Sequence, residues 1–125
     1  MPINADKIIY ALQGNMAAQI RWLKSCQILE PSNKGDGAIK KYPDQGWVTA
    51  YFSNFAAMAM IEEPSSYPFV ERYLDWYLRN LEKNGTILDY HYDSNMDVKT
   101  SKPDSEDAYA GTFLSLVSVF HQRAG

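Results

Sequence analysis

The stretch VTAYFSNFAAMAMI, residues 48–61, decides the fold, because it contains no charged side chain. Its polar members, Thr49, Ser53 and Asn54, lie near its start, and every residue from 55 to 61 is apolar. A helix that is apolar around its whole circumference must be covered on all sides. A membrane cannot provide this cover, because a helix needs about 20 residues to span a bilayer and this stretch is shorter. We therefore expect a helix over 48–61, enclosed by its own chain and by something beyond it.

Three further segments carry helical patterns. Apolar residues recur at helical spacing along residues 5–29 and 68–84, which predicts two amphipathic helices. Residues 105–123 are apolar over most of the circumference, as residues 48–61 are. The expected fold is therefore all-α, with amphipathic helices alternating with nearly apolar ones.

The order of the helices predicts two similar hairpins, about 1–63 and 64–125, within a single domain over 1–125. In each hairpin an amphipathic outer helix precedes a nearly apolar inner helix. Corresponding residues of the first and second hairpins are Trp22 and Trp76, Gly37 and Gly85, Ile39 and Ile87, Tyr51 and Tyr109, and Phe55 and Phe113. Repeats of this kind bury their apolar faces by stacking on one another.

Composition and charge exclude several classes of protein. Twelve basic and 15 acidic residues give a net charge of −3, which argues against nucleic-acid binding driven by phosphate neutralisation. Cys26 is the single cysteine, so the chain forms no intrachain disulfide. No apolar run approaches the length of a membrane span, and residues 1–4 lack the features of a secretory signal. We expect a cytoplasmic protein with neither a membrane nor a nucleic acid as partner.

Acidic side chains gather between residues 89 and 107, where six carboxylates face only Lys99 and Lys102. Two interpretations stay open for this segment: a solvated loop, or a site for a cation or a polyhydroxylated ligand. Residues 86–93, at its start, read as a short extended segment within a long loop.

Several stretches resemble the six-hairpin glycosidases, the (α/α)6-toroid superfamily. DSEDAYAGTFL (104–114) and WVTAYFSNFAA (47–57) are similar to inner helices of that family, and DWY (75–77) followed by GTILDY (85–90) is similar to an outer helix and its return loop. The resemblance implies a partial toroid, since six hairpins of this length need about 350 residues. The chain would hold two of the six.

The resemblance also implies a saccharide as substrate or ligand. We expect no cofactor and no metal. Glycoside hydrolysis needs two carboxylates, and Asp89, Asp104 and Asp107 are the candidates for catalysis. In a toroid the loops before the inner helices meet at one end, where further residues would contact the sugar. These candidate substrate-binding residues are Asp44, Trp47, Tyr51, Tyr90, His91 and Tyr109.

Other interpretations compete at the same residues. Asp104 and Asp107 stand at a helix start, where carboxylates cap the helix, and each aromatic residue has a plain role in core packing. The spacing of acidic residues over 93–104 resembles part of a calcium loop. Asp89, His91 and Asp93 alternate along the sequence, as ligands of a transition metal on one strand would. Residues 104–108 resemble the acidic box of terpene cyclases.

Two functions follow. The first is a glycoside-hydrolase-like helical module that binds or hydrolyses a saccharide. The alternative is a non-enzymatic module for self-association or interaction. Both predict a homo-oligomer joined through apolar helix faces, because large exposed apolar patches mark interfaces. A compact four-helix bundle is the structural rival, and it would leave part of 52–61 at the surface.

Overall fold

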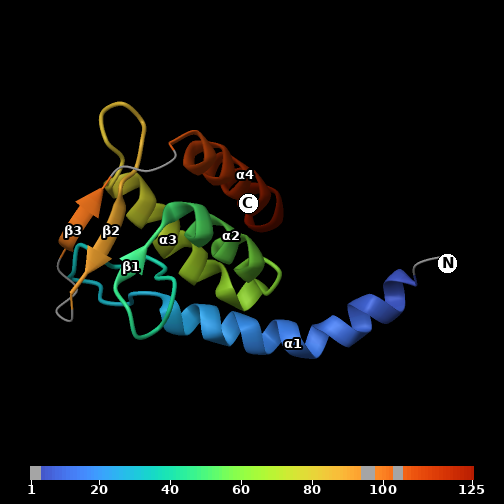
Figure 1. Cartoon of the computed structure of the whole chain (residues 1–125). Coiled ribbons are helices and arrows are strands. Elements are labelled where there is room, and N and C mark those ends of the chain that lie inside the picture. The colour runs from blue at the N-terminus through green and yellow to red at the C-terminus, as the bar shows by residue number, and fades with distance from the viewer. Residues whose placement is uncertain (1–3, 94–97, 103–105) are drawn as a thin grey trace.

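The computed structural model of the chain describes residues 4–93, 98–102 and 106–125, with only the backbone described at 9, 11–14, 99–102 and 106–108. Helices form most of it (Figure 1). They are α1 (Ala5–Cys26), α2 (Ala50–Met60), the short 3-10 helix η1 (Pro64–Ser66), α3 (Tyr67–Arg79) and α4 (Glu106–Ala124). The four predicted helices are therefore present in the predicted order.

Two of the predicted helices end earlier than expected. Asn4 caps α1 by accepting a hydrogen bond from the backbone N–H of Lys7, 3.0 Å away. The helix stops at Cys26 because Gln27 turns to an extended conformation and forms an antiparallel bridge with Ile39. α3 likewise ends at Arg79, ahead of the predicted residue 84. In α1, a backbone pairing distant in sequence overrides the helical pattern.

A three-stranded antiparallel sheet corrects the all-α expectation to a mostly helical fold. Its strands are β1 (Trp47–Val48), β2 (Asp89–Tyr92) and β3 (Val98–Lys102), in the order β1-β2-β3. β2 lies within the segment predicted to be extended. β1 has only two residues, too few for the alternating pattern that identifies a strand in a sequence.

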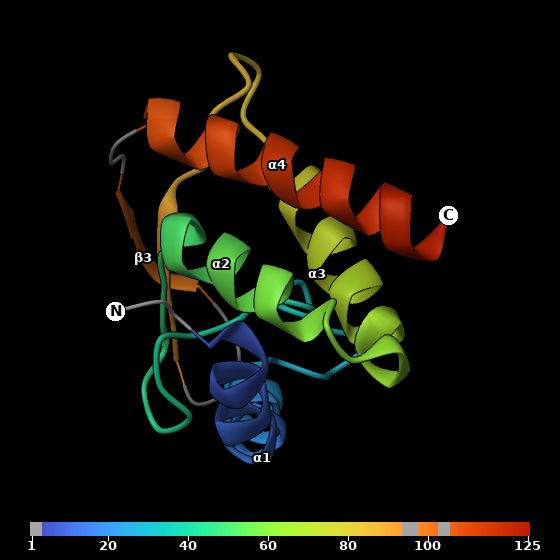
Figure 2. The same ribbon diagram turned by 90° about the vertical axis from the view of Figure 1, so that its right-hand side faces the viewer.

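The core lies between the helices and one face of this sheet. α2 packs chiefly against α4 and also contacts α1 and α3 (Figure 2). Trp76, Tyr73 and Tyr77 of α3 are buried, and the Tyr77 ring stacks on Phe113 of α4 with 3.7 Å between centroids. The two nearly apolar helices thus lie side by side, with α3 packed behind them.

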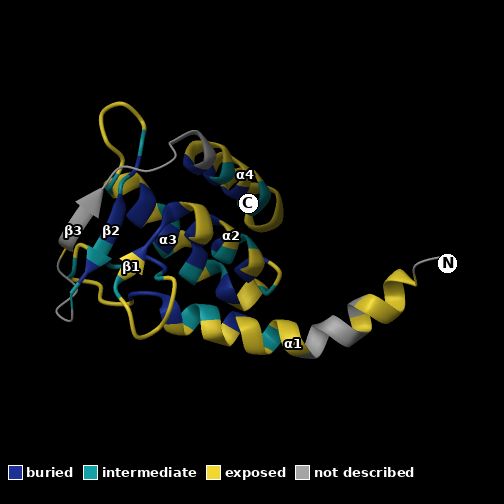
Figure 3. Ribbon diagram, viewed as in Figure 1, coloured by how far each residue is buried: buried dark blue, intermediate teal, exposed yellow. Residues whose placement is uncertain are grey.

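The chain alone encloses residues 48–61 only in part. Met60 and Ile61 are fully buried, but Phe52 and Phe55 are exposed. α4 and α3 cover one side of α2, while the opposite side is only partly covered by α1. The N-terminal half of α1 extends beyond the rest of the chain and is exposed where its side chains are described (Figure 3).

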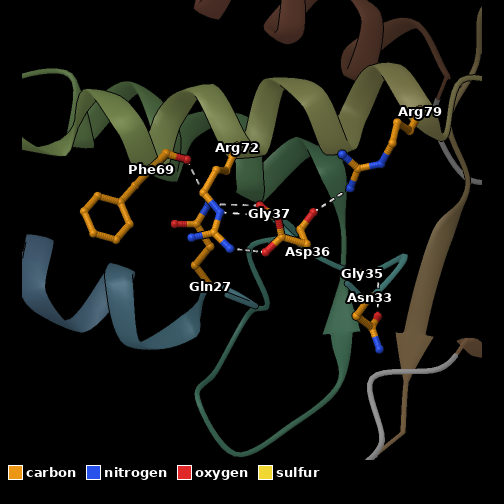
Figure 4. Close-up of polar contacts among 8 residues, drawn as sticks. All are labelled: Gln27, Asn33, Gly35, Asp36, Gly37, Phe69, Arg72 and Arg79. Carbon is orange, nitrogen blue, oxygen red and sulfur yellow. Dashed lines mark hydrogen bonds and ion pairs between the residues drawn. The ribbon is translucent and has the colours of Figure 1, made fainter. Parts of the chain in front are cut away.

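Polar contacts join residues 27–37, which follow α1, to α3 (Figure 4). The Gln27 side-chain amide donates to the carbonyl oxygens of Gly37 and Phe69, at 3.0 and 2.9 Å. Asp36 forms an ion pair with Arg72, and the Arg79 guanidinium donates to the Asp36 backbone oxygen at 2.8 Å. These contacts hold Gly37 directly against the backbone of α3.

Candidate functional site

The structure brings together two of the predicted site residues, Asp89 and Tyr109. Asp89 lies on β2 and Tyr109 in the first turns of α4, and both are buried. The Tyr109 hydroxyl donates to Asp89 Oδ1 at 2.6 Å. A carboxylate held this way joins the sheet to α4, and its burial keeps it from a ligand in solution.

The side chains of the other two candidate catalytic residues lie outside the described part of the structure. Asp104 is not among the described residues, and only the backbone of Asp107 is described, within α4. The proposed calcium-loop residues Asn95 and Asp97 are also outside the described ranges. Among the residues that are described, no group of three or more His, Cys, Asp and Glu side chains is placed to hold a metal ion.

Trp47 and His91 meet on the face of the sheet that also carries Asp89. Trp47 pairs directly with His91 in the register between β1 and β2. Their ring centroids are 4.5 Å apart, with an angle of 60° between the planes. Because alternate residues of a strand share a face, Asp89 and His91 project to the same side, as their spacing predicts. Trp47 remains exposed at the edge of this face.

The remaining predicted substrate-binding residues differ in how far they are buried. Tyr90 is buried against Trp76, and this burial raises the pKa of its phenol. Asp44 is exposed in the loop before β1. Tyr51 is exposed on α2, with its ring against Phe55 at 5.0 Å between centroids. Tyr90 is thus a core residue, whereas Asp44 and Tyr51 face solvent.

Sequence reasoning missed a groove of about 510 Å³ that we call the α1–α2 groove. It lies between the C-terminal part of α1, residues 39–42 and α2, and its lining is mostly apolar. The aromatic residues that line it are Trp22, Tyr42, Phe52 and Phe55. The Lys41 ammonium lies 5.2 Å from the centre of the Phe52 ring at its rim. The signal in the sequence that could have indicated this groove was the charge-free stretch 48–61, which forms α2.

A second feature that the sequence did not reveal is a buried polar network centred on Asn54. Its side-chain nitrogen donates to the Tyr109 carbonyl oxygen and to Thr112 Oγ1, at 3.2 and 2.7 Å. The Tyr73 hydroxyl donates to Asn54 Oδ1 at 2.6 Å. Burial, with the nearby Tyr77, raises the pKa of Tyr73 well above its usual value. The network joins α2, α3 and α4.

Comparisons with known proteins do not assign the chain to a family. No helix within the described ranges is both long enough and apolar enough to cross a bilayer. No protein-family model, curated protein or solved structure matches the chain. The resemblance to six-hairpin glycosidases therefore stays a prediction, and any function must be argued from the chain's own surfaces.

Proposed function

We propose that the chain is a helical interaction module that self-associates through the α1–α2 groove. The observation that carries the proposal is the exposure of Phe52 and Phe55 in a groove lined by four aromatic rings. Exposed apolar area lowers stability in water by about 25 cal/mol per Å² relative to burial. A second copy that covers these rings recovers that free energy.

The composition of the groove favours a protein surface over a charged small ligand. Aromatic residues are enriched at the centres of protein interfaces, where they act as anchors. Lys40 and Lys41 are the charged residues of the lining, and the Lys40 ammonium is bonded to the Pro43 carbonyl oxygen at 2.9 Å. The groove therefore offers an apolar centre with a basic rim.

Light scattering over protein concentrations of about 1 to 100 μM tests this proposal. We expect the average mass to rise above the 14.2 kDa of one chain, and Phe55→Asp to weaken association about 30-fold, since an interface anchor contributes about 2 kcal/mol. Tyr10→Asp is the matched control, because Tyr10 is an exposed aromatic residue of α1 outside the groove lining. A wild-type chain of constant 14.2 kDa mass would rule the proposal out.

A saccharide-binding module of the partial-toroid type is the second candidate function. The pairing of Trp47 with His91 favours it, because an exposed indole held in place by a neighbouring ring is suited to packing against the apolar face of a sugar. Asp89 supports the strand that carries His91. Hydrolysis by this module would need two carboxylates that reach the sugar. Because Asp89 is buried, Asp104 and Asp107 are the residues proposed for this role.

Titration of soluble oligosaccharides, followed by calorimetry, tests this second candidate. We expect Trp47→Ala to weaken binding about tenfold through the lost ring contact. Trp22→Ala should leave sugar affinity unchanged, since Trp22 is an exposed tryptophan that lines the groove instead. Equal losses in the two variants, or no sugar binding by the wild-type chain, would argue against a saccharide site at Trp47.

A further inference from the structure

Corresponding positions of the two hairpins differ sharply in burial. Trp76, Tyr109 and Phe113 of the second hairpin are 0%, 3% and 9% exposed. Their counterparts in the first hairpin, Trp22, Tyr51 and Phe55, are 46%, 37% and 47% exposed. The same residue types at matching positions are thus core residues in one hairpin and surface residues in the other.

The packing of α2 along α4 contributes to this difference in burial at Tyr109. α2 of the first hairpin packs along α4 of the second, and Asn54 of α2 bonds to Tyr109 and Thr112. In the second hairpin, α2 covers one side of the inner helix α4. In the first hairpin, no described segment of the chain fully covers the corresponding side of the inner helix α2. That side faces the α1–α2 groove, which Trp22 and Phe55 line.

The chain carries a surface of matching character on α4. Residues 109–120 include no charged side chain, and Leu114 is 69% exposed. At 100° per residue, Leu114 and Ser118 lie across the helix from the buried Tyr109. A Cβ atom at Gly111 would meet no other atom within 4 Å. This face of α4 is uncharged and partly formed by small residues, so another helix can approach it closely.

Figure 2 shows how the two surfaces are arranged. α4, α2 and α1 follow one another from top to bottom, so α4 and the α1–α2 groove lie on opposite sides of α2. α2 and α4 also run in the same direction. A second α4 placed in the groove parallel to α2 brings its acidic start, Glu106 and Asp107 in the sequence, to the end of the groove near Lys40 and Lys41.

We propose that the α1–α2 groove binds α4 of a second copy, head to tail, in the way that α2 binds beside α4 within one chain. This inference rests on the proposed self-association and specifies its geometry. The groove and the outer face of α4 are different surfaces, so every copy carries one of each. Such a heterologous contact builds closed rings or open chains of subunits.

Mixing two singly blocked variants tests the geometry. Phe55→Asp places a charge in the groove, and Leu114→Asp places one on the outer face of α4; both positions are exposed, so the fold is retained. Each variant alone should lose association about 30-fold. An equimolar mixture should form a one-to-one pair, because each variant keeps the surface that the other has lost.

Sedimentation velocity distinguishes the outcomes, with far-UV circular dichroism as the check on folding. The expected result is a dimer in the mixture alone, with larger species only for the wild-type chain. If the wild-type chain associates and the mixture does not form a pair, the head-to-tail geometry is overturned while self-association stands. If the wild-type chain remains a monomer, both proposals fail.

Discussion

Gly37→Ala is expected to destabilise the chain by about 3–5 kcal/mol, which is at the upper end for a single substitution. Gly37 has a φ of 92°, a conformation that strains residues with a side chain. A Cβ atom there would also collide with the backbone carbonyl oxygen of Arg72 on α3. α3 would have to move away, which would disturb the bonds from Gln27 to Gly37 and Phe69.

Gly85→Ala separates the two causes of that loss. Gly85 has a φ of 84°, yet a Cβ atom there would meet nothing within 4 Å. Its replacement should cost only the conformational strain, about 1–2 kcal/mol. Urea unfolding at one fixed protein concentration measures both variants, since self-association would otherwise shift the apparent stability. Equal losses would mean that the close contact with α3 adds nothing.

Asn54→Leu is expected to lower the free energy of unfolding by about 3 kcal/mol. The leucine has a similar size, but it leaves the buried Tyr73 hydroxyl without its acceptor on Asn54 and takes a donor from Tyr109 and Thr112. A buried polar group that loses its partner costs about 1–3 kcal/mol. Denaturant unfolding, with the unfolding slope checked for constancy, gives the difference.

Tyr73→Phe completes a double-mutant cycle with Asn54→Leu. In the wild-type background it removes the hydroxyl that bonds to Asn54 Oδ1 and should cost about 1 kcal/mol. In the Asn54→Leu background the same change removes a hydroxyl that has already lost its Asn54 acceptor, so it should cost less than in the wild-type background. Equal effects in the two backgrounds would show that the two side chains are not coupled.

The helices were predictable because their signals are long and local. The charge-free stretch at 48–61 and the apolar periodicity of 68–84 each extend over several turns, and α2 and α3 begin within two residues of the predicted starts. The likeness of Gly37 to Gly85 was also readable, and both have positive φ. These features depend on neighbours in sequence, which a single sequence contains.

The features that the sequence could not reveal depend on contacts between distant residues. β1 is too short to show a pattern, and it exists because residue 47 meets residue 91. The burial of Tyr109 and the exposure of Tyr51 follow from which neighbour each hairpin has, although the two motifs look alike. Asn54 reads as one polar residue in an apolar helix, and its three partners become visible only in three dimensions.

The pairing of β1 with β2 has a consequence for how the chain reaches its native state. These strands come from different hairpins, and Trp47 finds His91 only after the intervening chain has closed into a loop. Loop closure of this kind slows folding relative to purely local helical contacts. Repeat arrays often unfold one unit at a time. Because the sheet joins the two hairpins here, we expect them to fold and unfold together in a single cooperative step.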